Sequence, residues 1–172
     1  MQPVDDLFAP ESEPVAAATA GYVLCEFDGL AIAIPQSDVF AIEHGSELAA
    51  PLPGENVIGW FASTQGPWPV YALNRSLGIA THLSTERSFI VFLKADTWPL
   101  GILAQSVRII GNATELTTQQ IPGPLAKYAN GINGVARISA KQVAYVFEQH
   151  SLLALLTQLT VLPEISLGVR YG

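Results

Sequence analysis

The sequence is poor in charged residues, and the few that it has are mostly acidic. Charged residues make up 13% of the chain, and its 8 Lys and Arg face 15 Asp and Glu, for a net charge of -7. No basic cluster occurs anywhere along the chain. Such a surface repels nucleic-acid phosphates and anionic lipids. We therefore predict that nucleic acid is not a partner.

Ligands for a metal and groups for catalysis are equally scarce. Cys25 is the single cysteine, which excludes an internal disulfide and any site built from several thiolates. It lies in an alternating stretch, 22–27, which predicts a buried and inert thiol. The histidines are far apart and have no neighbouring ligand at metal spacing; they are His44, His82 and His150. The sequence predicts no metal, no cofactor and no enzyme.

One acidic group leaves a weak case for acid–base chemistry. Asp38, Glu43 and Glu47 lie close together in the sequence, but they flank a chain turn. Carboxylates tuned for catalysis need apolar burial or a like-charge partner, which a sequence does not reveal. We expect these three to keep one edge of the fold soluble.

Long hydrophobic runs are also missing. The richest stretch, 152–162, is shorter than the roughly 20 residues that span a bilayer, and Thr157, Gln158 and Thr160 interrupt it. Its leucines recur at helical spacing, which predicts a terminal helix at about 150–162 that packs on a core. The first residues are acidic where an export signal carries positive charge. We predict a cytoplasmic protein without direct membrane insertion.

Short apolar stretches between turn residues are abundant, and hydrophobic residues reach 49%. They predict an all-β fold with a C-terminal helix. Asp28-Gly29 is a strong signal for a tight hairpin turn. The expected strands and extended pieces are 22–27, 30–34, 38–43, 57–63, 69–73, 88–94, 99–104, 107–110, 131–138 and 143–147.

The order of these elements recurs in the second half of the chain. The segment from Val57-Ile58-Gly59 to Val70-Tyr71-Ala72-Leu73 resembles that from Ile132-Asn133-Gly134 to Ala144-Tyr145-Val146-Phe147, and a helix start is expected after each, at Asn74 and Gln149. Such a duplication favours paired small barrels. We expect a disordered acidic tail at 1–20, a first barrel at about 21–80, a second at about 86–150, and an extension at 161–172.

The tryptophans indicate a candidate surface for a partner. Trp60 and Trp68 surround the first long hairpin, and Trp98 lies in the matching hairpin of the second half. Trp68 stands between two prolines, where an apolar patch would suit a partner. Two other functions stay open: a small-ligand binder or enzyme on a closed barrel, and a barrel that captures extended peptides through Trp60 and Trp68.

Over residues 21–156 the chain resembles the CheW-like adaptor family. The resemblance is carried by Phe27-Asp28-Gly29-Leu30-Ala31-Ile32-Ala33-Ile34-Pro35, Asp38-Val39-Phe40-Ala41-Ile42, Pro51-Leu52-Pro53-Gly54 before Ile58-Gly59, Gly66, Pro69-Val70, Leu73, Gly101-Ile102-Leu103, Val107, Gly131-Ile132 and Gly134-Val135. It implies one CheW-like domain over 21–160, with two five-stranded SH3-like barrels around a shared core. It also implies a non-catalytic adaptor that couples a receptor tip, or a substitute input protein, to the regulatory domain of a CheA-type histidine kinase.

The resemblance also implies two docking surfaces. The receptor-facing groove would contain Val39, Ala41, Val57, Ile58, Trp60, Thr64 and Gln65. The kinase-facing surface would contain Leu125, Tyr128 and Ile132, with Tyr128 as the anchor.

Three positions depart from the family pattern. Thr64 stands where the family usually has Arg, Ala41 where it has an acidic residue, and Ala104-Gln105-Ser106 where many members have Val-Asp. We infer a retained scaffold whose receptor-facing surface has diverged.

Overall fold

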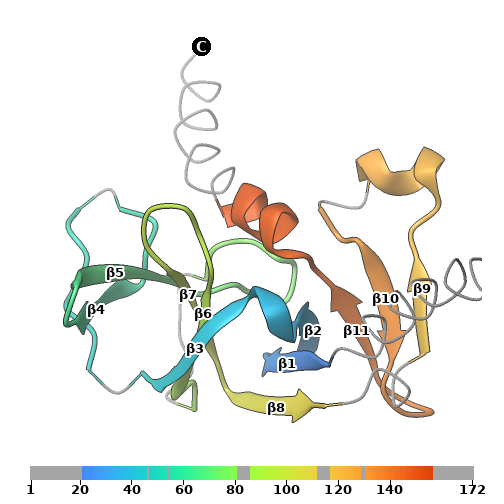
Figure 1. The fold of residues 1–172 in the computed structure, drawn as a ribbon, viewed down its shortest axis with the longest axis horizontal. Helices are drawn as coiled ribbons and strands as arrows, with labels where there is room; N and C mark the ends of the chain where they lie inside the picture. The colour runs from blue at the N-terminus through green and yellow to red at the C-terminus, as the bar shows by residue number, and fades with distance from the viewer. Residues whose placement is uncertain are drawn as a thin grey trace, which may run out of the picture.

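The computed structural model describes residues 21–45, 47–53, 55–80, 86–111, 117–128 and 131–156. The expected tail at 1–20, the extension at 161–172 and the helix beyond residue 156 lie outside these ranges. Within them the chain forms two sheets, two short 3₁₀ turns and a helix at 149–156 (Figure 1).

Each sheet mixes antiparallel hairpins with one parallel pairing. In spatial order, sheet A contains β8 (Ser106–Ile110), β1 (Tyr22–Phe27), β2 (Leu30–Pro35), β11 (Val143–Val146), β10 (Gly134–Arg137) and β9 (Thr117–Gln120). Sheet B contains β3 (Val39–His44), β6 (Phe89–Leu93), β7 (Leu100–Ala104), β5 (Gly66–Tyr71) and β4 (Gly59–Ser63). The 3₁₀ turns are η2 (Gln36–Asp38) and η4 (Gly123–Tyr128).

The two sheets do not correspond to the two halves of the chain. Sheet B is built from the continuous segment β3 to β7, whereas sheet A joins the β1–β2 hairpin to β8–β11 from the far end. The expected division into barrels at 21–80 and 86–150 is therefore wrong. The first hairpin of the N-terminal half, β1–β2, lies in sheet A with β9, β10 and β11 of the C-terminal half. The first hairpin of the C-terminal half, β6–β7, lies in sheet B with β3, β4 and β5 of the N-terminal half.

The duplication itself is visible in how the strands pair. In sheet A, β2 runs parallel to β11 of the β10–β11 hairpin, and in sheet B, β7 runs parallel to β5 of the β4–β5 hairpin. Gly59 pairs with Val70, and Gly134 with Val146. The sequence repeat therefore aligned the two glycines correctly. It misaligned the second strand of each hairpin by two residues, because it made Val70 equivalent to Ala144, whereas the structure makes Val70 equivalent to Val146.

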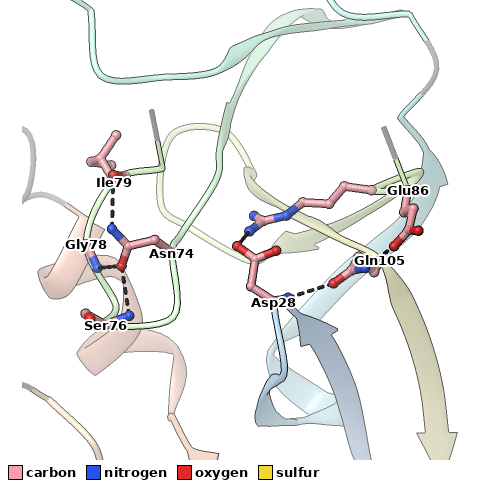
Figure 2. Close-up of polar contacts among 8 residues, drawn as sticks. Asp28, Asn74, Ser76, Gly78, Ile79, Glu86 and Gln105 are labelled. Carbon is pink, nitrogen blue, oxygen red and sulfur yellow. Dashed lines mark hydrogen bonds and ion pairs between the residues drawn. The ribbon is translucent and has the colours of Figure 1, made fainter. Parts of the chain in front are cut away.

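Local patterns predicted most strands, but one strand was missed and one expected helix start does not form. The strand β9 was missed because Thr117–Gln120 is polar and exposed throughout, and so has no alternation. The helix start expected at Asn74 is wrong: Oδ1 of Asn74 accepts hydrogen bonds from the backbone N–H of Ser76 (2.8 Å) and Gly78 (3.0 Å), which closes a turn (Figure 2). The helix expected at Gln149 does form.

Buried side chains form three clusters that follow this architecture. One fills the inner face of sheet A with small residues, chiefly Ala31, Ala33, Ala136 and Ala144. A second fills sheet B with larger ones, chiefly Trp68, Ile90 and Phe92. The third lies between the sheets and takes Leu152, Leu155 and Leu156 from the helix, which covers the junction of the sheets (Figure 1). Each fully buried leucine contributes roughly 1.5–3 kcal/mol.

Sheet B curls until side chains from non-neighbouring strands contact one another. Phe61 on β4 lies 5.2 Å from Phe92 on β6, and Phe40 on β3 lies 5.5 Å from Trp68 on β5, between ring centroids. Trp68 is only 8% exposed. The expected partner patch at Trp68 is therefore wrong, because this ring is buried in the barrel against Phe92.

The chain passes from one sheet to the other at two points, and polar contacts hold both. At the β7–β8 junction, the Gln105 side chain accepts from Asp28 N (2.6 Å) and donates to Glu86 Oε2 (2.7 Å) (Figure 2). Asp28 also forms a 2.7 Å ion pair with Arg87. The Arg87 side chain is fully buried, with its guanidinium 5.0 Å from the centroid of the Phe27 ring. This network joins the β1–β2 turn of sheet A to the start of β6 in sheet B.

The second crossing, at η2, is joined to the helix. The Asp38 carboxylate accepts a hydrogen bond from Gln149 N (2.9 Å), and Lys94 N donates to the Asp38 backbone carbonyl (3.0 Å). A carboxylate at a helix N-terminus satisfies a free N–H and complements the helix dipole. Asp38 therefore joins this crossing to the helix, in addition to any effect that it has on solubility.

We expect Gly59→Ala to destabilise the protein by about 1–3 kcal/mol, because the new Cβ would lie 2.7 Å from Leu48 Cβ and 2.9 Å from the Ala49 carbonyl oxygen. Gly111→Ala is the matched control, since nothing lies within 4 Å of its added Cβ. Chemical denaturation of both variants measures the difference. Equal midpoints would show that the segment at Leu48 and Ala49, which forms a single β-bridge with Trp60, has room to move.

We expect Asp28→Asn to cost about 1–3 kcal/mol, because it leaves a buried guanidinium without its carboxylate. Asn tolerates the left-handed conformation of this turn, where φ is 50° at Asp28 and 78° at Gly29, so the substitution isolates the charge. The control is Asp96→Asn, which removes an exposed carboxylate from another turn. Thermal unfolding that gives the same loss for both would contradict a role for the ion pair.

Candidate functional site

The outer side of sheet B carries an aromatic groove of about 330 Å³. Adjacent strands β4, β5 and β7 form its floor, because Trp60 pairs with Pro69 and the next residues, Val70 and Gly101, pair across β5 and β7. The lining residues are Glu55, Asn56, Val57, Trp60, Pro69, Tyr71, Trp98 and Leu100. We call these eight residues the aromatic groove.

Strand alternation explains why this face is aromatic. Phe61 and Trp68 form one cross-strand pair and point into the barrel, so the neighbouring pair of Trp60 and Pro69 faces the other side. Trp98 comes from the β6–β7 turn and is 51% exposed. The groove therefore has one ring on a strand and another on a turn that approaches from a different hairpin.

Glu55 fixes one wall of the aromatic groove. Its Oε2 accepts from the Trp60 indole Nε1–H (2.9 Å) and from the backbone N–H of Leu52 (3.0 Å). These bonds tie the loop before β4 to the ring and place Leu52, which is 69% exposed, beside the carboxylate. Glu55 is the one carboxylate in the lining, which contains no Lys or Arg.

The structure separates the residues that were predicted to face a receptor. Val57 and Trp60 lie together in the aromatic groove. Thr64 and Gln65 form the exposed tip of the β4–β5 hairpin. Ile58 packs toward the interior of sheet B, Val39 packs against the core between the sheets, and Ala41 is half-buried on β3.

The residues predicted to face a kinase lie near one another in the chain but differ in exposure. Leu125 lies on η4 and is 54% exposed, whereas Ile132 packs against the core between the sheets. The backbone of Tyr128 ends η4, and its side chain lies outside the described part of the structure. Of the two whose side chains the structure describes, Leu125 is the one available as an apolar contact.

Two functional residues, Glu55 and Tyr71, escaped the sequence-based reasoning, and Trp98 was noted among the tryptophans but not placed in this groove. Glu55 gave no signal, because its role depends on a loop that folds back onto Trp60. Tyr71 and Trp98 come from strands or turns that only the parallel β5–β7 pairing brings together. Trp98 offered one clue, since it is a large apolar residue in a predicted turn.

A smaller groove of about 240 Å³ lies on sheet A, lined by Thr117, Gln119, Val135, Arg137 and Val143. It occupies the corresponding place in the duplicated architecture, since Val135 follows Gly134 as Trp60 follows Gly59. Its lining has neither a ring nor a carboxylate. The two equivalent faces have therefore acquired different chemistry.

Among the described residues, no three His, Cys, Asp or Glu side chains come together in a way that would hold a metal. Within the same ranges, no helix is long and apolar enough to cross a membrane. Cys25 is buried, and burial raises the pKa of its thiol to about 12, which suppresses the reactive thiolate. The prediction of a buried thiol is confirmed.

The fold defines a class: mostly β, with two sheets, each wrapped around its own cluster, and a C-terminal helix, as in proteins with two SH3-like barrels. The crystal structure of the scaffolding protein TtCheW from Thermoanaerobacter tengcongensis has this fold, with a TM-score of 0.59. The match covers 78% of this chain and 92% of that one, at 16% sequence identity. The chain therefore has a CheW-like fold.

Sequence comparison alone does not reach this result. No protein-family model matches the chain, and no curated protein matches its sequence. The resemblance noted from short motifs is thus supported by three-dimensional structure at a level of identity where sequence searches fail.

We expect Cys25 to resist alkylation by iodoacetamide in the folded protein and to react only after unfolding, because desolvation disfavours its thiolate. Mass spectrometry after timed labelling at pH 8 measures this. Guanidinium-unfolded protein serves as the positive control. Rapid labelling of the native chain would mean that the thiol is accessible.

Proposed function

We propose that this chain is a non-catalytic cytoplasmic adaptor. It couples a receptor, or another input protein, to the regulatory domain of a CheA-type histidine kinase in chemosensory signalling. The observation that carries the proposal is the CheW-like fold, found over most of both chains. Because fold alone does not specify function, the surfaces must support the proposal as well.

The distribution of side chains supports a docking role over a catalytic one. Each barrel contains its own cluster of buried apolar side chains, which favours a packed interior over a ligand chamber. The features available to partners lie outside, as exposed apolar side chains and the aromatic groove. Apolar patches and half-exposed tryptophans are typical of protein interfaces.

We assign the two partners to different parts of the molecule. The input protein is held by sheet B at the aromatic groove, with Val57 and Trp60 as central contacts and the tip at Thr64 and Gln65 beside them. The kinase is held by the segment 125–132, with Leu125 as its apolar contact. Separate surfaces allow one adaptor to bind both partners together.

The rival functions have less support. A small-ligand binder would use an interior cavity, and the described barrel interiors are packed. A peptide-capturing barrel that uses both Trp60 and Trp68 loses one anchor, because Trp68 is buried. An adaptor with an external groove accounts for the exposed Trp98 and the buried Trp68 alike.

The test uses the full chain as bait in an extract of its native cells, with bound proteins identified by mass spectrometry. We expect a histidine kinase of the CheA type, and titration of its regulatory domain should then give a Kd. Leu125→Ala should weaken this binding about 10- to 30-fold, as loss of a central apolar anchor commonly costs roughly 2 kcal/mol.

Ile109→Ala is the matched control, since Ile109 on β8 is 55% exposed and Leu125 is 54% exposed. Its Kd should stay within twofold of the parent value. Failure to recover any histidine kinase would argue against the adaptor role. Equal losses in the two variants would move the kinase surface away from η4.

A further inference from the structure

We propose that the aromatic groove binds an arginine side chain of the input protein. The inference deepens the proposed function and rests on it only for the identity of the partner as a protein. The groove combines aromatic rings, Trp60, Trp98 and Tyr71, with one carboxylate, Glu55. Aromatic faces beside a carboxylate attract a cation through both the ring quadrupole and the full negative charge.

The charge of the groove selects the sign of its occupant. Glu55 is the single charged residue of the lining, and the whole chain has a net charge of -7. In the described part of the chain, both hydrogen bonds to this carboxylate end on Oε2. Oε1 of Glu55 is therefore the oxygen that would accept a hydrogen bond from the partner. An acidic or purely apolar partner would leave that atom without one.

The geometry selects arginine among the cations. A guanidinium is planar, stacks on indole faces and still donates N–H groups at its edge. A quaternary ammonium has no N–H for the carboxylate, and a lysine ammonium is more strongly hydrated. The groove volume, about 330 Å³, is at the lower end of ligand-sized clefts, which are about 300–1,000 Å³.

The openness of the site indicates a side chain on a protein and not a free molecule. Trp98 is 51% exposed, so its ring covers one face of an occupant without enclosing it. Leu52, held next to Glu55 by its N–H, is 69% exposed and offers an apolar contact to the backbone that carries the arginine. A free amino acid would make no use of that flanking surface.

This site also gives a physical meaning to the divergence noted in the sequence. Thr64 and Ala41 stand where a positive and a negative residue were expected, and the lining of the aromatic groove contains no Lys or Arg. With Glu55 in the groove, the cation of the interface comes from the partner.

The test is an NMR titration of the full chain, followed through its tryptophan indole N–H signals. The probe is the peptide acetyl-Gly-Arg-Gly-amide, compared with the same peptide carrying norleucine and with tetramethylammonium chloride. Arginine should shift the signals of Trp60 and Trp98 but not that of Trp68, which is buried in the barrel. The Trp60 proton is the most sensitive reporter, because it is bonded to Glu55.

Glu55→Gln should weaken arginine-peptide binding about 3- to 10-fold, since it removes the charge but keeps an oxygen for Trp60 and Leu52. The control is Glu43→Gln, which removes an exposed carboxylate from β3, away from the groove. Trp98→Ala, on an exposed turn, should weaken binding to a similar extent and provides a second variant if Glu55→Gln loosens the loop. The Trp68 signal checks that each variant is folded.

Several results would overturn the proposal: no shift at Trp60 and Trp98, equal shifts with the norleucine peptide, or tighter binding of tetramethylammonium than of arginine. Kinase binding through Leu125 is measured separately, so its failure would remove the adaptor function and leave arginine binding in place. Conversely, if the arginine peptide does not bind the aromatic groove, the proposed binding of the kinase through Leu125 is unaffected.

Discussion

The parallel pairing of β2 with β11 is the contact on which the rest of the architecture depends, because it joins the beginning of the described chain to its end. It makes sheet A from two distant segments and lets sheet B form between them without interruption. The helix at 149–156 follows β11 directly and closes the core between the sheets. The polar contacts at Gln105 and Asp38 then hold the two places where the chain leaves one sheet for the other. Strand exchange, core and crossings thus form one connected system.

Local chemistry predicted most of the strands and the class of fold. Alternation at 22–27, the Asp28-Gly29 turn and the leucine spacing after residue 150 each depend on neighbours in sequence. The strand and the turn were found as expected, and the helix forms at 149–156, up to where the described residues end. Strand pairing was different. Period-2 alternation states which face is buried but not which strand lies alongside, so the halves could not be seen to exchange hairpins. The predictions at β9 and at Asn74 failed for a related reason. Pairing with a neighbouring strand outweighed local preference at β9, and a side-chain hydrogen bond outweighed it at Asn74.

The candidate site was predicted less well than the fold. Val57 and Trp60 were identified and do share a groove, but Ile58, in the bend just before β4, packs toward the interior of sheet B. Trp68 looked exposed because prolines flank it, yet the curl of sheet B turns it inward against Phe92. Glu55, Tyr71 and Trp98 meet only through long-range pairing. A groove made by three strands and two connections leaves no compact signature in one dimension, which is why family resemblance pointed to a surface but not to its chemistry.

The discontinuity of sheet A has a consequence for how the protein is made. During synthesis on the ribosome, the β1–β2 hairpin emerges first but finds its neighbour β11 only after most of the chain has followed. Sheet B, being continuous, can close in the meantime. The first hairpin must therefore wait with the edge of β2 unpaired, a state open to misassociation with other nascent chains. Sheet A is therefore complete only after β11 has left the ribosome, whereas every strand of sheet B precedes β8 in the chain.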